Sequence, residues 1–327
     1  MLDTTHWGIL GTGKIAREFA AAIADTPGAV LAAVASRDAA TAAAFARECG
    51  AHASYGSYQA LVDAPDVDLV YIASPHPMHA ENALMALAAG KGVLCEKAFT
   101  INRREAESVV ALAREKQLFL MEAMWTRFMP ALAEVRRIVA AGAIGAPTQL
   151  TADFGFFAKV SEQHRVLNRE LGGGALLDLG IYPLSVACAL LGSVESVRAS
   201  ATMGPTGVDV QTGFVLKHGN GAISSCACSL VARTPCELTI AGPLGQVRMN
   251  SRFHETTSIS VVLADGTAYE LPTPYLGNGY VHEIMEAQRC FHAGLIESPG
   301  MTHAETLALM GLMDEMRAQI GLRYPAD

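Results

Sequence analysis

The first part of the chain, to about residue 122, alternates short apolar runs with segments whose apolar residues recur every three to four positions. The short runs predict strands, and the periodic, alanine-rich segments predict helices. Strand and helix in alternation indicate βαβ units, and therefore a parallel sheet with right-handed crossovers. The predicted strands are His6–Leu10, Val30–Ser36, Leu69–Ala73, Val93–Cys95 and Phe119–Met121, and the predicted helices are Ile15–Ala24, Ala39–Cys49, Met78–Ala89 and Arg103–Lys116.

After Pro130 the pattern changes. One helix, Ala131–Ala140, and one strand, Thr148–Phe157, are followed mainly by strand-like runs. Glycine-containing turns separate three pairs of these runs, and glycine supplies the positive φ angles that tight hairpins need. The turns are His218–Gly221, Gly242–Gly245 and Ala264–Thr267. We therefore predict an antiparallel sheet here, with helices near 175–191, 280–293 and 303–320.

Length and composition limit the classes of function. At 327 residues the chain has the length of two domains of roughly 150 residues each. The hydrophobic content of 51% is enough for packed cores, and no apolar run reaches the roughly 20 residues of a membrane span. The net charge of -8 argues against nucleic-acid binding. We expect neither a membrane partner nor a nucleic-acid partner.

The N-terminus and the cysteines indicate the compartment. MLDTTHWGIL has an early acid and no basic segment, so a signal peptide is not expected. The seven cysteines are scattered and odd in number. Cys226, Cys228 and Cys236 lie close in sequence, but no second spaced ligand pair follows, so buried thiols are favoured over a metal site. We expect a cytoplasmic protein without a metal.

A glycine-rich turn follows the first predicted strand directly. The first glycine, Gly11, permits the tight turn, the second, Gly13, lets the backbone approach a pyrophosphate, and Ala16 is small enough for close helix–strand packing. The N-terminus of the next helix points its free amides at the anion. The pattern predicts a dinucleotide site formed by Gly11, Thr12, Gly13, Lys14 and Ile15.

The end of the second predicted strand bears on the choice of cofactor. A carboxylate there would bind the ribose 2′-hydroxyl and select NAD, but the chain has Ser36 and Arg37, and an arginine fork matches a 2′-phosphate. Asp38 follows, and it either serves the ribose or starts the next helix. The alternative for Arg37 is a surface arginine. We expect NADP, with NAD possible.

Polar residues also follow the next two predicted strands. Ligands of open α/β sheets bind outside the carboxyl ends of the strands, so Ser74, His76, His79 and Glu96 are expected near the nicotinamide ribose or the substrate. Each histidine is alternatively a polar loop residue or a helix cap. Lys97, at the end of an apolar strand beside a dinucleotide, suits the binding of a substrate hydroxyl, and its alternative role is an ion pair.

Five segments in order, GILGTGKIA, ASPHPMH, CEKAFT, MEAMWTRFMP and GGGALLDLGIY, resemble the Gfo/Idh/MocA oxidoreductase family, most of all its branch of dimeric dihydrodiol and NADP-dependent D-xylose dehydrogenases. The resemblance covers essentially the whole chain. It implies an α/β fold with an N-terminal Rossmann domain, 1–123, and a C-terminal α/β domain, 124–327. The large, open, mainly antiparallel sheet of the second domain is expected to form a homodimer interface.

The resemblance also implies functional residues. The family's Glu-Lys-Pro motif falls at Glu96-Lys97-Ala98, so its lysine corresponds to Lys97, although alanine replaces the proline. The Asp-x-Gly-x-His/Tyr motif falls at Asp178–Tyr182, which implies that Tyr182 is the acid/base residue. By the same resemblance, the residues near the nicotinamide and substrate are Trp125, Arg127, Phe154 and, as a weaker candidate, Tyr280. The alternative for the aromatic residues is packing in a core or domain interface.

Asp178 and Tyr182 are four positions apart in a predicted helix, so both project from one face of it. Pro183 lacks a helical amide, so the helix is expected to bend just after the tyrosine. Our hypothesis is hydride transfer from a carbinol carbon to nicotinamide C4, with Tyr182 taking the hydroxyl proton. A free tyrosine has a pKa near ~10. Lys97 therefore supplies a positive charge, and Asp178 holds a substrate hydroxyl or orients the pair. The alternative is an incidental Asp–Tyr pair in a core helix.

The expected substrate is a small sugar, polyol or trans-dihydrodiol. Trp125 is placed to stack on a sugar face, and Asp178, His79 and Arg127 to bond its hydroxyls. Within the resemblance two other functions stay open. One is a non-catalytic, NAD(P)-binding, sugar-responsive regulator, and the other is an NAD-dependent glycosidase of the same fold.

Overall fold

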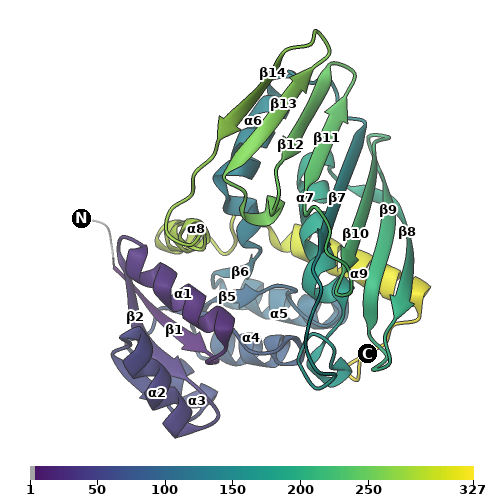
Figure 1. The fold of residues 1–327 in the computed structure, drawn as a ribbon. Helices are drawn as coiled ribbons and strands as arrows, with labels where there is room; N and C mark the ends of the chain where they lie inside the picture. The colour runs from purple at the N-terminus through teal and green to yellow at the C-terminus, as the bar shows by residue number, and fades with distance from the viewer. Residues whose placement is uncertain (1–3) are drawn as a thin grey trace. The chain divides into compact units, whose positions relative to one another are not determined.

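The computed structural model describes residues 4–327, which form two compact units (Figure 1). The first unit contains the chain up to Trp125 together with Leu276–Met310, and the second contains Thr126–Tyr275 and Gly311–Asp327. The expected division at residues 123/124 assumed two continuous segments. In the structure the chain returns to the first unit, because helix α8 (Val281–His292) packs on helix α1 (Lys14–Asp25).

Two side-chain hydrogen bonds tie α8 to the first unit. The indole Nε1 of Trp7 donates to Gln288 Oε1 over 3.2 Å, and Gln288 Nε2 donates to the carbonyl of Pro27 over 3.1 Å. Trp7 and Gln288 are both buried. The last helix, α9 (His303–Ile320), begins in the first unit and ends in the second.

The first unit holds a six-stranded sheet in the order β3-β2-β1-β4-β5-β6, with all pairs parallel. This confirms the βαβ prediction. The chain runs outward from β1 to β3 and then returns to β4 on the other side of β1, which creates a switch point beside β1. The strands are β1 (Thr5–Leu10), β2 (Ala29–Ala35), β3 (Ala53–Tyr55), β4 (Leu69–Ile72), β5 (Gly92–Glu96) and β6 (Leu120–Ala123).

Helices cover this sheet, and several have side-chain caps at their N-termini. Besides α1 and α8 they are α2 (Ala39–Cys49), α3 (Tyr58–Val62), α4 (His79–Ala88) and α5 (Arg103–Lys116). Ser57 caps α3 and Asn102 caps α5 by accepting a backbone amide of the first turn. Strand β3 and helix α3 were not predicted, because neither is long enough to show a clear period.

The second unit holds an eight-stranded sheet in the order β14-β13-β12-β11-β7-β10-β9-β8. The three predicted hairpins are confirmed, but β7 and β10 pair in parallel, so the sheet is mixed and mostly antiparallel. The strands are β7 (Gln149–Gly155), β8 (Val194–Met203), β9 (Asp209–His218), β10 (Ile223–Ser229), β11 (Leu238–Gly242), β12 (Gly245–Met249), β13 (Ser258–Leu263) and β14 (Ala268–Pro272).

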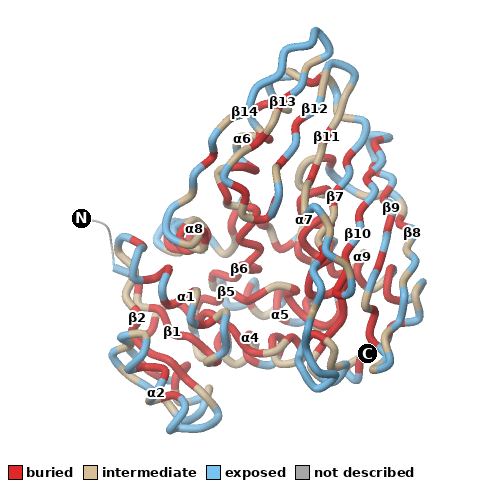
Figure 2. Tube along the Cα trace, in the orientation of Figure 1, coloured by how far each residue is buried: buried red, intermediate tan, exposed pale blue. Residues whose placement is uncertain are grey.

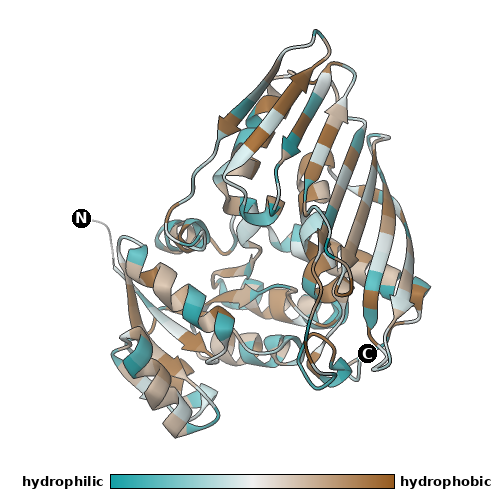
Figure 3. Cartoon of the chain, in the orientation of Figure 1, coloured by the Kyte–Doolittle hydropathy of each residue, from teal (hydrophilic) through white to brown (hydrophobic). Residues whose placement is uncertain are grey.

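Helices cover one face of this sheet. Helix α6 (Pro130–Ala140) packs on β12 and β13, and α7 (Ile181–Leu191) packs on β7 and β10. Burial alternates along β9 and β10, so that every second residue faces solvent (Figure 2). The hydropathy of the strands is banded in the same way (Figure 3). The alternation indicates a sheet with one packed face and one open face.

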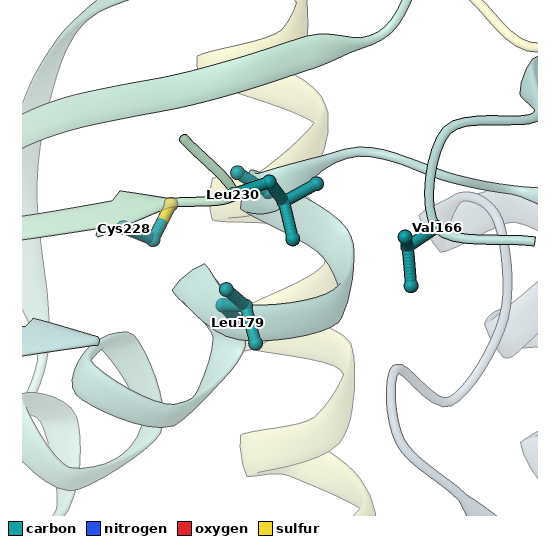
Figure 4. Packing of buried hydrophobic residues seen from close by; sticks show 5 residues of the cluster. Val166, Leu179, Cys228 and Leu230 are labelled. Carbon is teal, nitrogen blue, oxygen red and sulfur yellow. The ribbon is translucent and has the colours of Figure 1, made fainter. Parts of the chain in front are cut away.

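Within residues 4–327, one helical segment, Arg169–Leu191, is long and apolar enough to cross a membrane by those two criteria alone. Its most apolar window is 83% buried inside the protein, which is the burial of a core helix. Leu179 from this segment packs with Val166, Cys228 and Leu230 in a buried cluster (Figure 4). Cys228 is thus a buried thiol, and its burial raises its pKa well above the usual range.

Candidate functional site

The glycine turn lies at the end of β1 in the first unit. Gly11 has φ +108°, and a Cβ there would lie 2.8 Å from the carbonyl oxygen of Ala73, so only glycine fits. A Cβ at Gly13 would meet nothing within 4 Å, so the backbone is open to a ligand on that side. Among the described residues no side chain caps α1, and its first turn carries no acid, which suits an anion. Thr12 and Ile15 are half-buried and Lys14 is exposed.

Asp38 starts helix α2. Its carboxylate accepts bonds from the amide of Thr41 over 2.7 Å and from the Thr41 hydroxyl over 2.6 Å. The Thr41 hydroxyl and amide lower the pKa of Asp38, because they stabilise the charged form. Of the two roles left open by the sequence, the helix cap is the one the structure shows.

Ser36 and Arg37 lie beside the glycine turn. The amide of Gly11 donates to the carbonyl of Ala35 over 3.0 Å, which brings the ends of β1 and β2 together. The Arg37 side chain is exposed, and within the described chain its guanidinium makes no hydrogen bond or ion pair. Ser36 is half-buried. The residues that follow β2 thus include a hydroxyl and an exposed guanidinium, and a guanidinium can pair with a phosphate.

The two histidines bind backbone carbonyls around Lys97. His76 Nε2 lies 3.2 Å from the carbonyl of Lys97, and His79 Nδ1 lies 3.0 Å from that of Ala98. The other ring nitrogen of His79 lies 2.8 Å from the carbonyl of Ser74, and the side chain is 1% exposed. Both ring nitrogens of His79 thus face backbone carbonyls in a buried position, which suits its alternative role as a structural polar residue. Its role toward a substrate stays a prediction.

Glu96 is buried directly before Lys97. The hydroxyl of Tyr71 donates to Oε1 of Glu96, and the amide of Lys97 donates to Oε2 over 3.2 Å. Glu283 from α8 is also buried, and burial first and the charge of Glu96 second raise its pKa well above the usual range. Tyr71 and Glu283 were not identified from the sequence, because both look like ordinary core positions. Each carboxylate oxygen of Glu96 accepts a hydrogen bond from the protein, so Glu96 helps to hold the backbone at Lys97.

Two of the aromatic residues implied by the resemblance pair with each other. The rings of Trp125 and Tyr280 stack with centroids 4.5 Å apart and an angle of 20° between planes, and both belong to the first unit. Trp125 is only 4% exposed. Arg127 belongs to the second unit, is buried, and donates from Nε to the hydroxyl of Ser185 over 3.0 Å.

Asp178 and Tyr182 lie at a change of helix type in the second unit. Leu176–Gly180 forms a π-helical turn that continues into α7, which starts at Ile181. The sequence predicted a bend after Tyr182, and the structure has an irregular, wider turn directly before it. The physical reason is Pro183, which has no amide to donate to the preceding turn. Asp178 and Tyr182 are both buried, at 5% and 6% exposure.

The glycines before this helix let a loop approach closely. The amide of Gly173 donates to the carbonyl of Asn168 and that of Gly174 to the carbonyl of Val166, both over 2.9 Å. A Cβ on Gly173 would lie 2.7 Å from the carbonyl oxygen of Arg165. Glycine is therefore required for the loop to lie against the helix that carries Asp178.

Asp209 of β9 holds the start of the same helix. Its Oδ2 accepts from the amide of Leu176 over 2.7 Å and from the hydroxyl of Thr212 over 2.6 Å. The hydroxyl of Tyr324, near the C-terminus, donates to the carbonyl of Gly173 over 2.6 Å. Asp209 is fully buried, and burial raises its pKa. Neither residue was identified from the sequence, because the contacts link positions more than 30 residues apart.

Replacing Asp209 with Ala is expected to lower the free energy of unfolding by about 1–3 kcal/mol, because the Leu176 amide and the Thr212 hydroxyl lose their buried acceptor. Asp209→Asn keeps an oxygen in place and is expected to lose less. Urea unfolding followed by circular dichroism measures both. Equal losses in the two variants would show that the hydrogen bonds are not the cause.

An aromatic group surrounds Tyr182. The ring of Phe154 lies 5.2 Å from it and that of His254 lies 5.5 Å from it, centroid to centroid. Phe154 and His254 also stack on each other at 4.3 Å, with 15° between planes. Phe154 thus lies next to the acid/base candidate, and its place near the nicotinamide and substrate stays a prediction. His254 was missed, because a lone histidine in a turn carries no recognisable pattern.

The described residues contain no group of three His, Cys, Asp or Glu side chains able to hold a metal ion. Cys226 and Cys228 are buried in β10, and Cys236 is half-buried. The chemical groups available are therefore a dinucleotide-type turn with an exposed arginine after the next strand, a lysine whose backbone contacts His76, and a buried Asp178 and Tyr182 on one helical segment.

Comparison with known proteins identifies both units. Residues 5–124 match the model of an oxidoreductase family with an NAD-binding Rossmann fold, and residues 132–248 match the Gfo/Idh/MocA C-terminal domain. The chain is 36% identical to trans-1,2-dihydrobenzene-1,2-diol dehydrogenase of Danio rerio, over 98% of each chain. It is 33% identical to the NADP-dependent D-xylose 1-dehydrogenase of Hypocrea jecorina, over 98% of this chain and 93% of the other.

Solved structures show the same fold. A 3-ketoreductase from Actinomadura kijaniata, in complex with NADP and TDP-benzene, superimposes with a TM-score of 0.87 and 27% identity, over 97% of this chain and 98% of that one. Levoglucosan dehydrogenase, in complex with NADH and levoglucosan, superimposes with a TM-score of 0.89 at 21% identity, over 98% of each chain. At that identity the second likeness concerns the fold alone.

Proposed function

This chain belongs to the Gfo/Idh/MocA oxidoreductase family, and on that premise we propose that it is an NADP-dependent dehydrogenase of a sugar, polyol or trans-dihydrodiol. Hydride passes between a hydroxyl-bearing carbon of the substrate and the nicotinamide. The observation that carries the proposal is the open glycine turn at the end of β1, in a chain that aligns over its full length with dehydrogenases of a diol and of D-xylose.

We propose that Lys97, Asp178 and Tyr182 act on the substrate. The cofactor, when bound, supplies the hydride acceptor. Tyr182, as the phenolate, takes the hydroxyl proton and becomes the phenol, Lys97 provides the positive charge that favours the phenolate, and the Asp178 carboxylate accepts a bond from a substrate hydroxyl. In support, Tyr182 is buried beside two aromatic rings, and the histidines contact the backbone carbonyls of Lys97 and Ala98.

The preference for NADP is assigned to Arg37. Arg37→Leu is expected to raise KM for NADP by about 10- to 100-fold and to leave KM for NAD nearly unchanged, because only NADP carries the 2′-phosphate that pairs with a guanidinium. The measurement is initial rate against concentration for each cofactor. Arg47→Leu, which removes an exposed arginine of α2, is the matched control. Equal changes for NADP and NAD would contradict the assignment.

We also propose that the chain acts in the cytoplasm as a homodimer. All seven cysteines are free, which suits a reducing compartment. The open face of the large sheet carries small and apolar residues such as Val215, Ile223 and Ala227, and pairing of two copies would cover it. Sedimentation equilibrium measures the mass in solution, and a monomer at all concentrations would contradict the dimer.

The function is tested by absorbance at the reduced-nicotinamide band. Aldoses, cyclic polyols and trans-dihydrodiols are added to the chain with NADP or NAD. We expect reduction of NADP with at least one of these substrates and slower reduction of NAD. A flat absorbance with every substrate would contradict the dehydrogenase function. Turnover of a glycoside without net reduction would indicate a glycosidase instead.

A further inference from the structure

Asp178 is paired with an arginine that neither the sequence patterns nor the family motif indicated. Nη1 of Arg165 lies 3.3 Å from Oδ1 of Asp178. The two partners differ in exposure, since the Arg165 side chain is 54% accessible and that of Asp178 only 7%. A buried acceptor and an exposed donor thus stand side by side in the second unit.

The backbone at Arg165 is held firmly on the helix of Asp178. Gly173 and Gly174 donate to the carbonyls of Asn168 and Val166, and Val166 packs in the buried cluster with Leu179 (Figure 4). The close approach at Gly173 leaves no room for a Cβ beside the carbonyl of Arg165. The position of Arg165 relative to Asp178 is therefore set by the fold, while its guanidinium extends into solvent.

The guanidinium of Arg165 has N–H donors that the described part of the protein does not use. Arginine has five N–H donors, and within residues 4–327 only Nη1 of Arg165 makes a hydrogen bond from the side chain, to one carboxylate oxygen at 3.3 Å. This is longer than the 2.7–2.9 Å usual for charge-assisted bonds, so the contact is a weak one that a ligand can rearrange. A carboxylate that accepts, next to a guanidinium that donates, matches two neighbouring hydroxyls. One hydroxyl donates to Asp178 and the other accepts from Arg165.

We propose that Arg165 is a specificity-determining residue that binds the hydroxyl adjacent to the one held by Asp178, so that the site selects vicinal diols over single alcohols. The inference rests on the proposed function, because it takes Asp178 as a substrate ligand. It adds a substrate class: sugars, polyols or dihydrodiols with a free hydroxyl on the carbon next to the reacting one. No covalent step is involved, since Arg165 only donates hydrogen bonds.

The test compares substrate pairs that differ in one hydroxyl. D-xylose is compared with 2-deoxy-D-xylose, and trans-cyclohex-3-ene-1,2-diol with cyclohex-2-en-1-ol. In Arg165→Gln we expect kcat/KM for the diol member to fall by about 10- to 100-fold, mostly through KM, because one charge-assisted hydrogen bond is lost. The member without the second hydroxyl is expected to change little, so the ratio of the two values falls. Arg165→Lys keeps a positive charge, so we expect its kcat/KM ratio to lie between those of Arg165→Gln and the wild type.

Arg169→Gln is the matched control. Arg169 lies four residues further along the same segment, is 49% accessible, and its nearest acid is Glu170 at 3.8 Å. This variant is expected to keep the wild-type ratio. Melting temperatures of all variants show whether Arg165 merely supports the loop. Equal losses on both members of a pair in Arg165→Gln, or no loss, would overturn the proposal while the dehydrogenase function stands. If the wild-type chain oxidises no aldose, polyol or dihydrodiol with either cofactor, both the proposal and the dehydrogenase function are overturned.

Discussion

Replacing Tyr182 with Phe is expected to lower kcat at saturating substrate by about 100-fold or more, while the dissociation constant for NADP stays unchanged. The phenolate of Tyr182 is the proposed acceptor of the hydroxyl proton, and general acid–base catalysis contributes roughly 10²- to 10⁴-fold. Phenylalanine keeps the ring contacts with Phe154 and His254, so the aromatic group stays packed. Steady-state rates give kcat, and quenching of protein fluorescence by NADP gives the binding constant.

The control for this variant is Tyr269→Phe, which removes a hydroxyl from an exposed tyrosine of β14 in the same unit. It is expected to keep full activity. Unchanged kcat in Tyr182→Phe would show that another group takes the proton. His254 would then be the first residue to examine, because its ring lies 5.5 Å from that of Tyr182 and, unlike Phe154, it can carry a proton.

Replacing Lys97 with Met is expected to lower kcat/KM by about 10²- to 10³-fold. It is also expected to move the midpoint of the pH–rate profile, the pH at which the rate rises as the phenol ionises, to higher pH. Both follow from the loss of a positive charge, since a cation favours the charged form of a nearby phenol and binds the substrate oxygen. Methionine keeps most of the length of the side chain. Initial rates between pH 6 and pH 10 measure the two effects together.

Lys116→Met is the matched control, because Lys116 is an exposed lysine in the last turn of α5. If the pH–rate profile of Lys97→Met keeps its midpoint and only the activity falls at every pH, Lys97 does not act on the ionisation of Tyr182. Binding of the substrate would then be its remaining role. The contacts of His76 and His79 with the carbonyls of Lys97 and Ala98 explain why the lysine segment is rigid enough for either role.

Much of the candidate site could be predicted because its signals are local. Gly11 needs a positive φ, which the strand–turn–helix context already requires. The three hairpins were predicted for the same reason, since the glycine turns and the alternation of the strands are properties of consecutive residues. The family motifs added Lys97, Asp178 and Tyr182, whose assigned roles stay predictions.

Other residues could not be placed because their roles come from contacts distant in sequence. His79 was expected near the ligand, and only the structure shows that its buried ring contacts the carbonyls of Ser74 and Ala98. Asp209 and Tyr324 looked like ordinary strand and tail residues, and they hold the helix that carries Asp178. Each of these contacts forms only once separate elements have packed together.

The sequence by itself determined the parallel sheet of the first unit, the hairpins of the second, and the glycine turn that suits a dinucleotide. Period, turn chemistry and glycine conformation act over a few consecutive residues, so they can be read without a fold. Only the tertiary structure decided that Leu276–Met310 packs in the first unit, that β7 and β10 run parallel, and that Arg165 lies against Asp178. These three features depend on contacts between segments far apart in the sequence, and the pattern of neighbouring residues does not specify such contacts.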